Sequence, residues 1–192
     1  MEDKQLLYQG FHSVERLETV IKGEKRVYEK LVIKSYVTAL MTDAAGKIGL
    51  VLEYRPCVNE VVYDVPGGFL DKEGLTNREV LAEELQEECE IYAADIELLS
   101  EEPLQTHYVF CGSSDAKEFM YRVKLNSIQQ SRDVDDCDVQ RVEWLTFSEF
   151  EKMARSGVLK SPSAMLAYMY LKEELAGGEK WTGTLSTSIC YL

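Results

Sequence analysis

Hydrophobic positions divide the chain into short runs typical of strands and longer amphipathic stretches typical of helices. Runs of β-branched, aromatic and aliphatic residues predict strands over residues 36–41, 48–54, 61–65, 96–99, 108–111, 119–125 and 139–145. Helical spacing predicts helices over residues 77–88, 148–156 and 163–175. At the first helix, Thr76 and Glu79 form a capping box. Its apolar stripe of Val80, Leu81 and Leu85 is expected to pack on a sheet.

The first 34 residues differ from the rest of the chain. Residues 6–33 are rich in β-branched and aromatic residues, and Lys22-Gly23-Glu24 interrupts them, which predicts an antiparallel hairpin. We therefore expect an N-terminal β arm over residues 1–34, a main domain over residues 35–176 and a loosely held tail over residues 177–192. The expected fold class is α/β, or α+β, with a mixed sheet and helices against it.

Composition limits the possible partners. A net charge of -13 argues against nucleic acid, because affinity for a phosphate backbone depends on Lys and Arg. The same charge repels a small phosphate ligand unless divalent metal ions intervene. Five cysteines without CxxC spacing indicate reduced thiols rather than a zinc site. No apolar run reaches the roughly 20 residues of a membrane span, so we expect a soluble, cytoplasmic protein.

The predicted helix 77–88 carries the most informative polar pattern. Glu84, Glu87 and Glu88 stand at i, i+3 and i+4, so their carboxylates emerge on one helix face, as hard ligands suited to Mg²⁺ or Mn²⁺. The alternative is an acidic face that points at water. However, Glu79, Glu83 and Glu87 are like-charge neighbours, and each pair costs about 0.2 to 0.5 kcal/mol. A bound cation would reverse that penalty.

The segment from Gly67 to Ile91 resembles the Nudix box, G-x5-E-x7-R-E-U-x-E-E-x-G-U with U a bulky apolar residue. By that resemblance, Glu84, Glu87 and Glu88 hold magnesium. The match is partial, because Glu83 occupies the arginine position and Glu90 the glycine position. The loop is one residue longer, with Gly74-Leu75 where the first glutamate is expected. In the family that glutamate and arginine brace the loop against the helix, so we expect the brace to be absent.

The resemblance covers about residues 32–175 and implies a Nudix-type α/β/α sandwich. Tyr54-Arg55-Pro56 is similar to a strand end that holds substrate phosphate in the family, which gives that role to Arg55; a surface cation is the alternative. Asp64-Val65-Pro66-Gly67-Gly68, which we read as a strand end and a tight turn, is similar to the segment that leads into the box of ADP-sugar pyrophosphatases. By that likeness the Gly67 carbonyl joins the metal ligands.

Further candidate residues follow from the same likeness. The loop 111–118 is similar to one that borders the sugar, so Asp115 and Glu118 are candidate substrate contacts, with an ordinary polar hairpin as the alternative. The acidic loop 133–138 supplies Asp136 or Asp138 as a catalytic base or ligand; we favour Asp138, although a solvated loop is the alternative. An aromatic platform for the base is offered by residues of the arm, Tyr8, Phe11 or Tyr28, of which Phe11 and Tyr28 are favoured.

The resemblance therefore implies an Mg²⁺-dependent hydrolase that cleaves the pyrophosphate of a nucleoside diphosphate sugar, with ADP-ribose favoured. UDP-sugar hydrolysis is an alternative, because the box variant Gly-Leu-Thr ending Glu-Glu-Cys is similar to that of UDP-glucose pyrophosphatase. A third alternative is a non-catalytic Nudix domain that binds a nucleotide sugar or a protein partner, suggested by Glu83 and Glu90. In the enzymes that the chain resembles, the arm belongs to a dimer interface, so a homodimer is expected.

Overall fold

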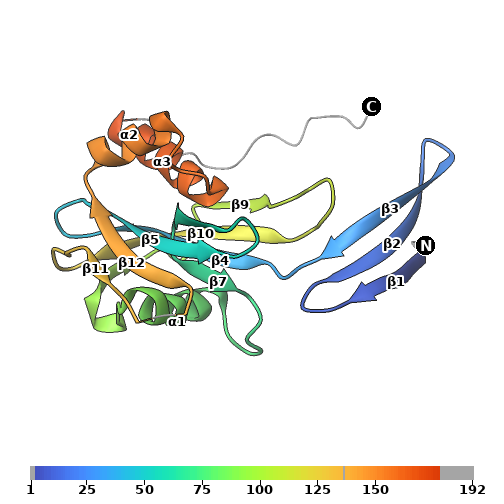
Figure 1. Cartoon of the computed structure of the whole chain (residues 1–192), viewed down its shortest axis with the longest axis horizontal. Helices are drawn as coiled ribbons and strands as arrows, with labels where there is room; N and C mark the ends of the chain where they lie inside the picture. Colours follow the sequence, from blue (N-terminus) through green and yellow to red (C-terminus); the bar gives the residue numbers. More distant parts are fainter. Residues whose placement is uncertain (1–2, 136, 178–192) are drawn as a thin grey trace.

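A computed structural model describes residues 3–135 and 137–177 of the chain. Its N-terminal arm is an antiparallel sheet of β1 (Asp3–Gln9), β2 (Ser13–Ile21) and β3 (Glu24–Val32), which projects from the main body (Figure 1). The predicted hairpin is confirmed as β2 and β3, joined through Lys22 and Gly23 with φ of 52° and 83°. The prediction missed the third strand, β1.

The main body contains one nine-stranded mixed sheet, as expected for the fold class. Its longest path runs β11-β12-β5-β4-β10-β8, with β6 beside β5, β7 beside β4 and β9 beside β10. The pair β4 and β10 is parallel and the other pairs are antiparallel. The strands are β4 (Tyr36–Thr42), β5 (Ile48–Arg55), β6 (Glu60–Asp64), β7 (Gly67–Phe69), β8 (Ile96–Leu99), β9 (Gln105–Tyr108), β10 (Lys117–Leu125), β11 (Arg132–Asp133) and β12 (Val139–Leu145).

Helices cover both faces of this sheet (Figure 1). Helix α1 (Asn77–Cys89) packs on one face, and α2 (Phe147–Ser156) and α3 (Pro162–Leu175) pack on the other; a 3-10 turn, η1 (Ala93–Asp95), follows α1. Each face has its own hydrophobic core, one containing Leu81 and Leu85 and the other Phe150. None of the helices in the described part of the chain is long and apolar enough to cross a bilayer.

Local signals at the start of α1 are confirmed. Thr76 accepts a hydrogen bond from the backbone of Glu79, whose side chain accepts one from the backbone of Thr76, and the predicted apolar stripe is fully buried. Two other predictions are wrong. Pro66-Gly67-Gly68 is not a simple turn, because Gly67 begins strand β7. The strand predicted over 108–111 ends at Tyr108, because the Phe110 carbonyl accepts from the amides of Ser113 and Ser114 and so closes a turn.

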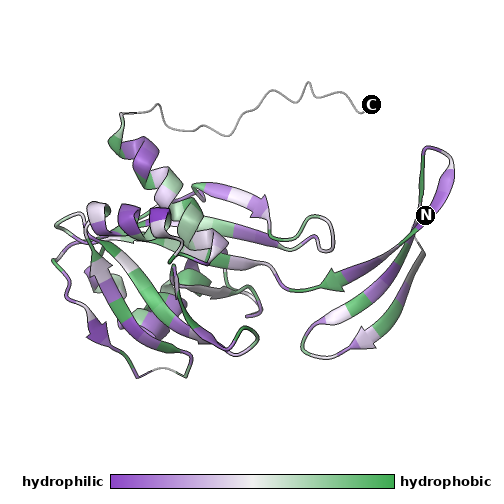
Figure 2. Ribbon diagram, turned by 45° about the horizontal axis from the view of Figure 1, so that its top comes forward, coloured by the Kyte–Doolittle hydropathy of each residue, from purple (hydrophilic) through white to green (hydrophobic). Residues whose placement is uncertain are grey.

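The arm and the body differ in the burial of their apolar side chains. Its strands alternate hydrophobic and hydrophilic residues along their length (Figure 2), and no residue of the described arm belongs to either core. Two links tie the arm to the loop between β9 and β10: the Leu31 amide donates to the Ser113 carbonyl (2.7 Å), and Lys30 pairs with Asp115 (2.5 Å). Several of its large apolar residues are exposed, namely Leu6, Leu7, Tyr8, Phe11, Val20, Ile21, Val27 and Tyr28.

Candidate active site

Strand β7 brings two glycines into close contact with their surroundings. It pairs with β4 so that Gly67 faces Thr38 and Gly68 faces Val37. A Cβ at Gly67 would lie 2.0 Å from the Val37 carbonyl oxygen, and a Cβ at Gly68 would lie 2.3 Å from Cδ of Glu84. Both positions therefore require glycine for space, the first against a strand and the second against a carboxylate.

The predicted acidic residues of α1 meet this strand. Glu88 Oε2 accepts a hydrogen bond of 2.9 Å from the Gly67 amide, and the carboxylate of Glu84 packs against Gly68. The side chain of Glu84 is 16% exposed, whereas that of Glu87 is 59% exposed and lies at the rim. Burial is the main cause that raises the pKa of Glu84, and it outweighs the opposite effect of Lys72. Two of the three predicted ligands thus lie against the glycine strand.

Lys72 of the preceding loop lies among these carboxylates, a contact that helical spacing alone does not predict. Its Nζ is 2.8 Å from Glu83 Oε2 and 3.7 Å from Oε1 of both Glu84 and Glu87. The expectation of a missing brace is therefore corrected. The loop and the helix are joined by an ion pair with the charges exchanged, the cation on the loop and the anion, Glu83, at the box arginine position.

The end of α1 explains how Glu90 replaces the box glycine. Glu90 is the C-cap and adopts the left-handed conformation, with φ 52° and ψ 36°, which glycine adopts most easily. Its carboxylate accepts a hydrogen bond from Arg132 Nε (3.1 Å), and Arg132 also donates to the carbonyl of Cys89. A cation at a helix C-terminus is favourable, so Arg132 and Glu90 together complete the end of the helix without a glycine.

Arg55 lies at the end of β5 between two acids. It forms ion pairs with Glu53 and with Asp64, the latter at 3.4 Å. Asp64 lies three residues before Gly67 along the chain, and burial is the main cause that raises its pKa. The Tyr54 amide donates to the carbonyl of Asp138 (3.0 Å), so the late acidic loop borders the same strand end. Asp136, the other candidate of that loop, lies outside the described residues.

Phe11 of the arm reaches the same region of the body. Its ring lies 6.2 Å from that of Phe69, edge to face, and Tyr36 lies 6.2 Å from Phe69 on the other side. His12 also contacts Phe69, at 6.1 Å. Phe69 directly follows Gly68 in the strand, and its pairing partner Tyr36 lies on the face covered by α3, so these rings lie on the opposite face of β7 from the Glu84 carboxylate. The sequence patterns did not single out Phe69 or Tyr36. Phe69 directly follows the Gly-Gly pair, and this position was a usable signal; Tyr36 lies in β4, the strand that pairs with β7. Tyr28 is exposed on β3.

The two candidates from the loop before β10 lie apart. Asp115 is exposed and pairs with Lys30 of the arm. Glu118 is fully buried on β10, where it accepts hydrogen bonds from Thr38 (2.7 Å), Ser163 (2.9 Å) and Tyr36 (3.2 Å). His107 Nε2 also lies 3.2 Å from its carboxylate. Glu118 is therefore enclosed by hydroxyl groups and an imidazole rather than facing an open cleft.

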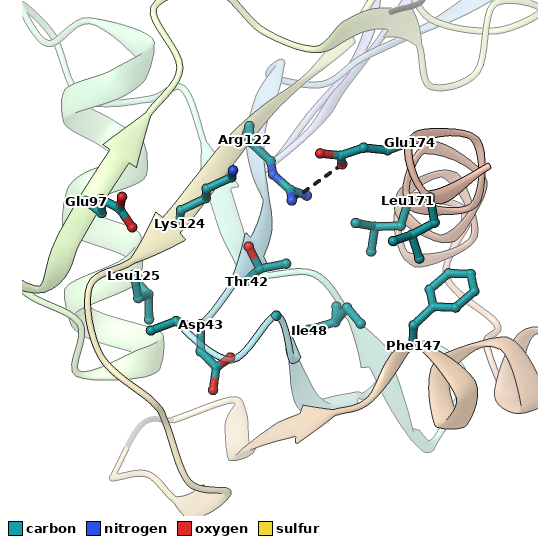
Figure 3. A pocket seen from close by; sticks show the side chains of 13 residues that line it. Thr42, Asp43, Ile48, Glu97, Arg122, Lys124, Leu125, Phe147, Leu171 and Glu174 are labelled. Atoms are coloured by element: carbon teal, nitrogen blue, oxygen red, sulfur yellow. Dashed lines mark ion pairs between the residues drawn. The ribbon is translucent and has the colours of Figure 1, made fainter. Parts of the chain in front are cut away.

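A cavity of about 390 Å³ opens at the opposite end of β4, beside Thr42 and Asp43. Figure 3 shows Arg122 pairing there with Glu174, at 3.5 Å, with Leu171 and Phe147 on the α2 and α3 side. None of the candidate site residues is part of its lining. Within residues 3–135 and 137–177, no three acidic, His or Cys groups converge tightly enough for a formed metal centre.

The structure is thus an α/β/α sandwich in which a glycine-rich strand leads into a capped acidic helix. The family model described as NUDIX domain matches residues 33–163, more than half of the sequence, and the chain belongs to the Nudix family. Membership implies a pyrophosphohydrolase of nucleoside diphosphate derivatives, and such hydrolases generally use divalent ions such as Mg²⁺. A search of curated proteins found no match.

Proposed function

We propose that the protein is an Mg²⁺-dependent hydrolase that cleaves the pyrophosphate of a nucleoside diphosphate sugar, with ADP-ribose favoured, to a nucleoside monophosphate and a sugar phosphate. The observation that carries this proposal is the packing of the Glu84 and Glu88 carboxylates against Gly67 and Gly68. A side chain at Gly68 would fill the space that the Glu84 carboxylate uses, so the strand is shaped around an anionic group.

The residues present supply donor atoms of the kind that suit a divalent cation, although in the described part of the chain they are not drawn together into a formed centre. Carboxylates of Glu84, Glu87 and Glu88 and the carbonyl of Gly67 are oxygen donors of the kind that Mg²⁺ and Mn²⁺ prefer. The Nζ of Lys72 lies within ion-pair distance of Glu83, Glu84 and Glu87, so this acidic face also attracts a cation of the chain itself. When bound, the metal would neutralise the pyrophosphate oxygens and activate the attacking water.

Residues of the chain supply the remaining functions. Arg55 orients the diphosphate. Its guanidinium pairs with Asp64, which precedes Gly67 by three residues in the chain, and it can exchange this carboxylate for a phosphate oxygen of the substrate. Phe11, beside Phe69, offers a stacking surface for the base, and Tyr28 is a second candidate. Asp138 accepts the proton of the attacking water at its carboxylate. Asp115, which is exposed, is the candidate contact of the sugar, whereas we propose a structural role for the fully buried Glu118.

Two other functions compete with this one. UDP-sugar hydrolysis uses the same site and is supported by the box variant that ends in Glu-Glu-Cys. A non-catalytic Nudix domain that binds a nucleotide sugar or a protein partner is supported by the ion pair of Lys72 with Glu83, which places a cation of the chain itself among the proposed metal ligands.

We also propose that the arm forms a homodimer. Its exposed apolar side chains form a surface that a monomer would leave in water, and such surfaces mark protein interfaces. A dimer is expected to sediment at twice the 21.9 kDa of the chain. A purely monomeric mass at micromolar concentration would contradict this.

The function is tested with ADP-ribose, other ADP-sugars and UDP-sugars in Mg²⁺, with hydrolysis scored by the phosphate that an added phosphatase releases from the products. Glu88→Gln keeps the shape of the side chain and is expected to lower turnover at least about 100-fold, because a metal ligand is lost. Glu73→Gln removes the same charge from the adjacent loop and is the matched control. Equal turnover of Glu88→Gln and wild type would refute the site; saturable binding without turnover of any substrate would favour the non-catalytic domain.

A further inference from the structure

Lys72 is the basic residue whose contacts coincide with the proposed metal ligands. Its ammonium is anchored on Glu83 at 2.8 Å and stands 3.7 Å from one oxygen each of Glu84 and Glu87. A lysine ammonium is a compact charge on a flexible stem and has three donors, so it can balance several carboxylates at once. It therefore occupies the region that a divalent cation bound to Glu84 and Glu87 would enter.

The surrounding charges explain why a cation is held there. Glu83 and Glu87 lie one helical turn apart, and Glu84 lies between them in a half-buried position, so their mutual repulsion destabilises the helix surface. In the described structure Lys72 is the cation paired with these three acids. Its side chain is only 34% exposed, because it lies across the acidic face rather than extending into water.

The loop that carries Lys72 turns at a glycine. Gly74 follows two residues later with φ +84°, and a Cβ there would meet nothing within 4 Å. The anchor on Glu83 is shorter than the two contacts with Glu84 and Glu87. A small change in the loop can thus withdraw the ammonium from the two outer contacts and leave it on Glu83.

We propose that Lys72 is a tethered counter-ion of the acidic site, which holds Glu84 and Glu87 together in the metal-free protein and is displaced from them when a divalent cation binds. This proposal rests on the proposed function only in taking Glu84 and Glu87 as metal ligands. It makes Lys72 a positioning residue that lowers the affinity for the metal, because each binding event must break two ion contacts and bring a second cation near the ammonium.

The test is direct binding of Mn²⁺, with free Mn²⁺ measured by electron paramagnetic resonance in the absence of substrate. Lys72→Met keeps most of the apolar stem and removes the charge. We expect its Kd for Mn²⁺ to fall about five-fold, since a competing charge a few ångströms from the ligands is lost. We also expect the metal-free variant to melt below wild type and to regain the wild-type melting temperature when Mn²⁺ is saturating.

The matched control is Lys34→Met. Lys34 pairs with Asp71 of the same loop at 3.7 Å, so this variant removes the same charge nearby without touching Glu84 or Glu87. Its Mn²⁺ affinity should stay within two-fold of wild type. Lys72→Arg retains the charge and should also bind Mn²⁺ as wild type does.

The outcomes separate this proposal from the function. An unchanged Mn²⁺ affinity in Lys72→Met overturns the counter-ion role, even if the enzyme hydrolyses nucleotide sugars. Weaker Mn²⁺ binding in that variant also overturns it and gives Lys72 a purely bracing role. Tighter binding in Lys72→Met with no turnover in wild type supports the counter-ion and refutes only the proposed function. A wild-type protein that binds no Mn²⁺ contradicts both.

Discussion

Two clusters of buried carboxylate lie on opposite faces of the central sheet, and they are built in different ways. On the face covered by α3, Glu118 is fully buried and accepts hydrogen bonds from Thr38, Ser163 and Tyr36. Burial is the main cause that raises the pKa of Tyr36, so its phenol keeps the proton that it donates. On the face covered by α1, Glu84 is half-buried against Gly68, and the Nζ of Lys72 lies 3.7 Å from its carboxylate.

This difference separates a structural acid from one suited to bind a cation. A carboxylate whose lone pairs are filled by protein donors is satisfied and rigid, and a metal ion would have to displace those donors. The Glu84 carboxylate instead packs against glycine, and the ammonium of Lys72 lies 3.7 Å away, a contact longer than the hydrogen bonds of Glu118. We infer that the site of chemistry is the less satisfied of the two clusters.

The largest effect on activity is expected from Gly68→Ala, which disturbs the α1 cluster and leaves the cluster around Glu118 unchanged. The added Cβ would meet Glu84 Cδ at 2.3 Å, so the carboxylate must move away from the strand. We expect hydrolysis to fall at least about 100-fold, equivalent to roughly 2.7 kcal/mol of transition-state stabilisation. The control is Gly112→Ala, whose Cβ would meet nothing within 4 Å. Steady-state kinetics and circular dichroism check both; a fully active Gly68→Ala would show that the position of Glu84 is unimportant.

Sequence patterns predicted the elements whose signals are local. The capping box at Thr76, the apolar stripe of α1 and the Lys22-Gly23 turn depend on residues within five positions of one another, and all are confirmed. Strand β7 was not predicted, because a three-residue strand containing two glycines forms only through its pairing with β4. The turn at Phe110 was missed because aromatic and β-branched residues continue across it.

The site shows the same division between local and long-range information. Helical spacing placed Glu84, Glu87 and Glu88 on one surface, but spacing alone does not show which of them is buried. The contact of Lys72 with Glu83 spans eleven residues and a loop, and the contact of Phe11 with Phe69 joins the arm to the body. Such contacts depend on how elements pack against one another, and the periodicity of one segment does not show which other segments it contacts.

A second test is Glu118→Gln, which probes the saturated cluster. The amide nitrogen would face hydroxyl donors that now give hydrogen bonds to a carboxylate oxygen, and we expect the free energy of unfolding to fall by about 1 to 3 kcal/mol. Turnover should change less than about two-fold if the role is structural. Denaturant unfolding and kinetics measure the two effects, with the exposed Glu101→Gln as the control. A raised KM at unchanged stability would instead make Glu118 a sugar contact, as the sequence suggested.

The smallest effect is expected on the stability of the Glu84→Gln variant in the absence of metal. Unlike Glu118→Gln, this substitution is expected to stabilise the protein. Burial raises the pKa of Glu84 above its unfolded value of 4.5, so the folded state holds the proton more tightly than the unfolded state. The free energy of unfolding therefore falls as pH rises from the unfolded pKa through the folded pKa, and ionised Glu84 destabilises the protein at neutral pH. Removing the charge should raise the melting temperature in EDTA at pH 7 slightly. The gain should vanish below pH 4.5, where the carboxyl is protonated in both states.

Glu87→Gln, on the same helix but 59% exposed, is the control for that measurement and should shift the melting temperature less. Glu84→Gln should at the same time abolish most hydrolysis, since Glu84 is a proposed metal ligand. A residue that costs stability yet is required for activity is typical of a binding site built before its ligand arrives. If Glu84→Gln instead lowers the metal-free melting temperature at pH 7, the attraction of Lys72 outweighs the burial of the charge, and the α1 cluster is as well satisfied as the one around Glu118.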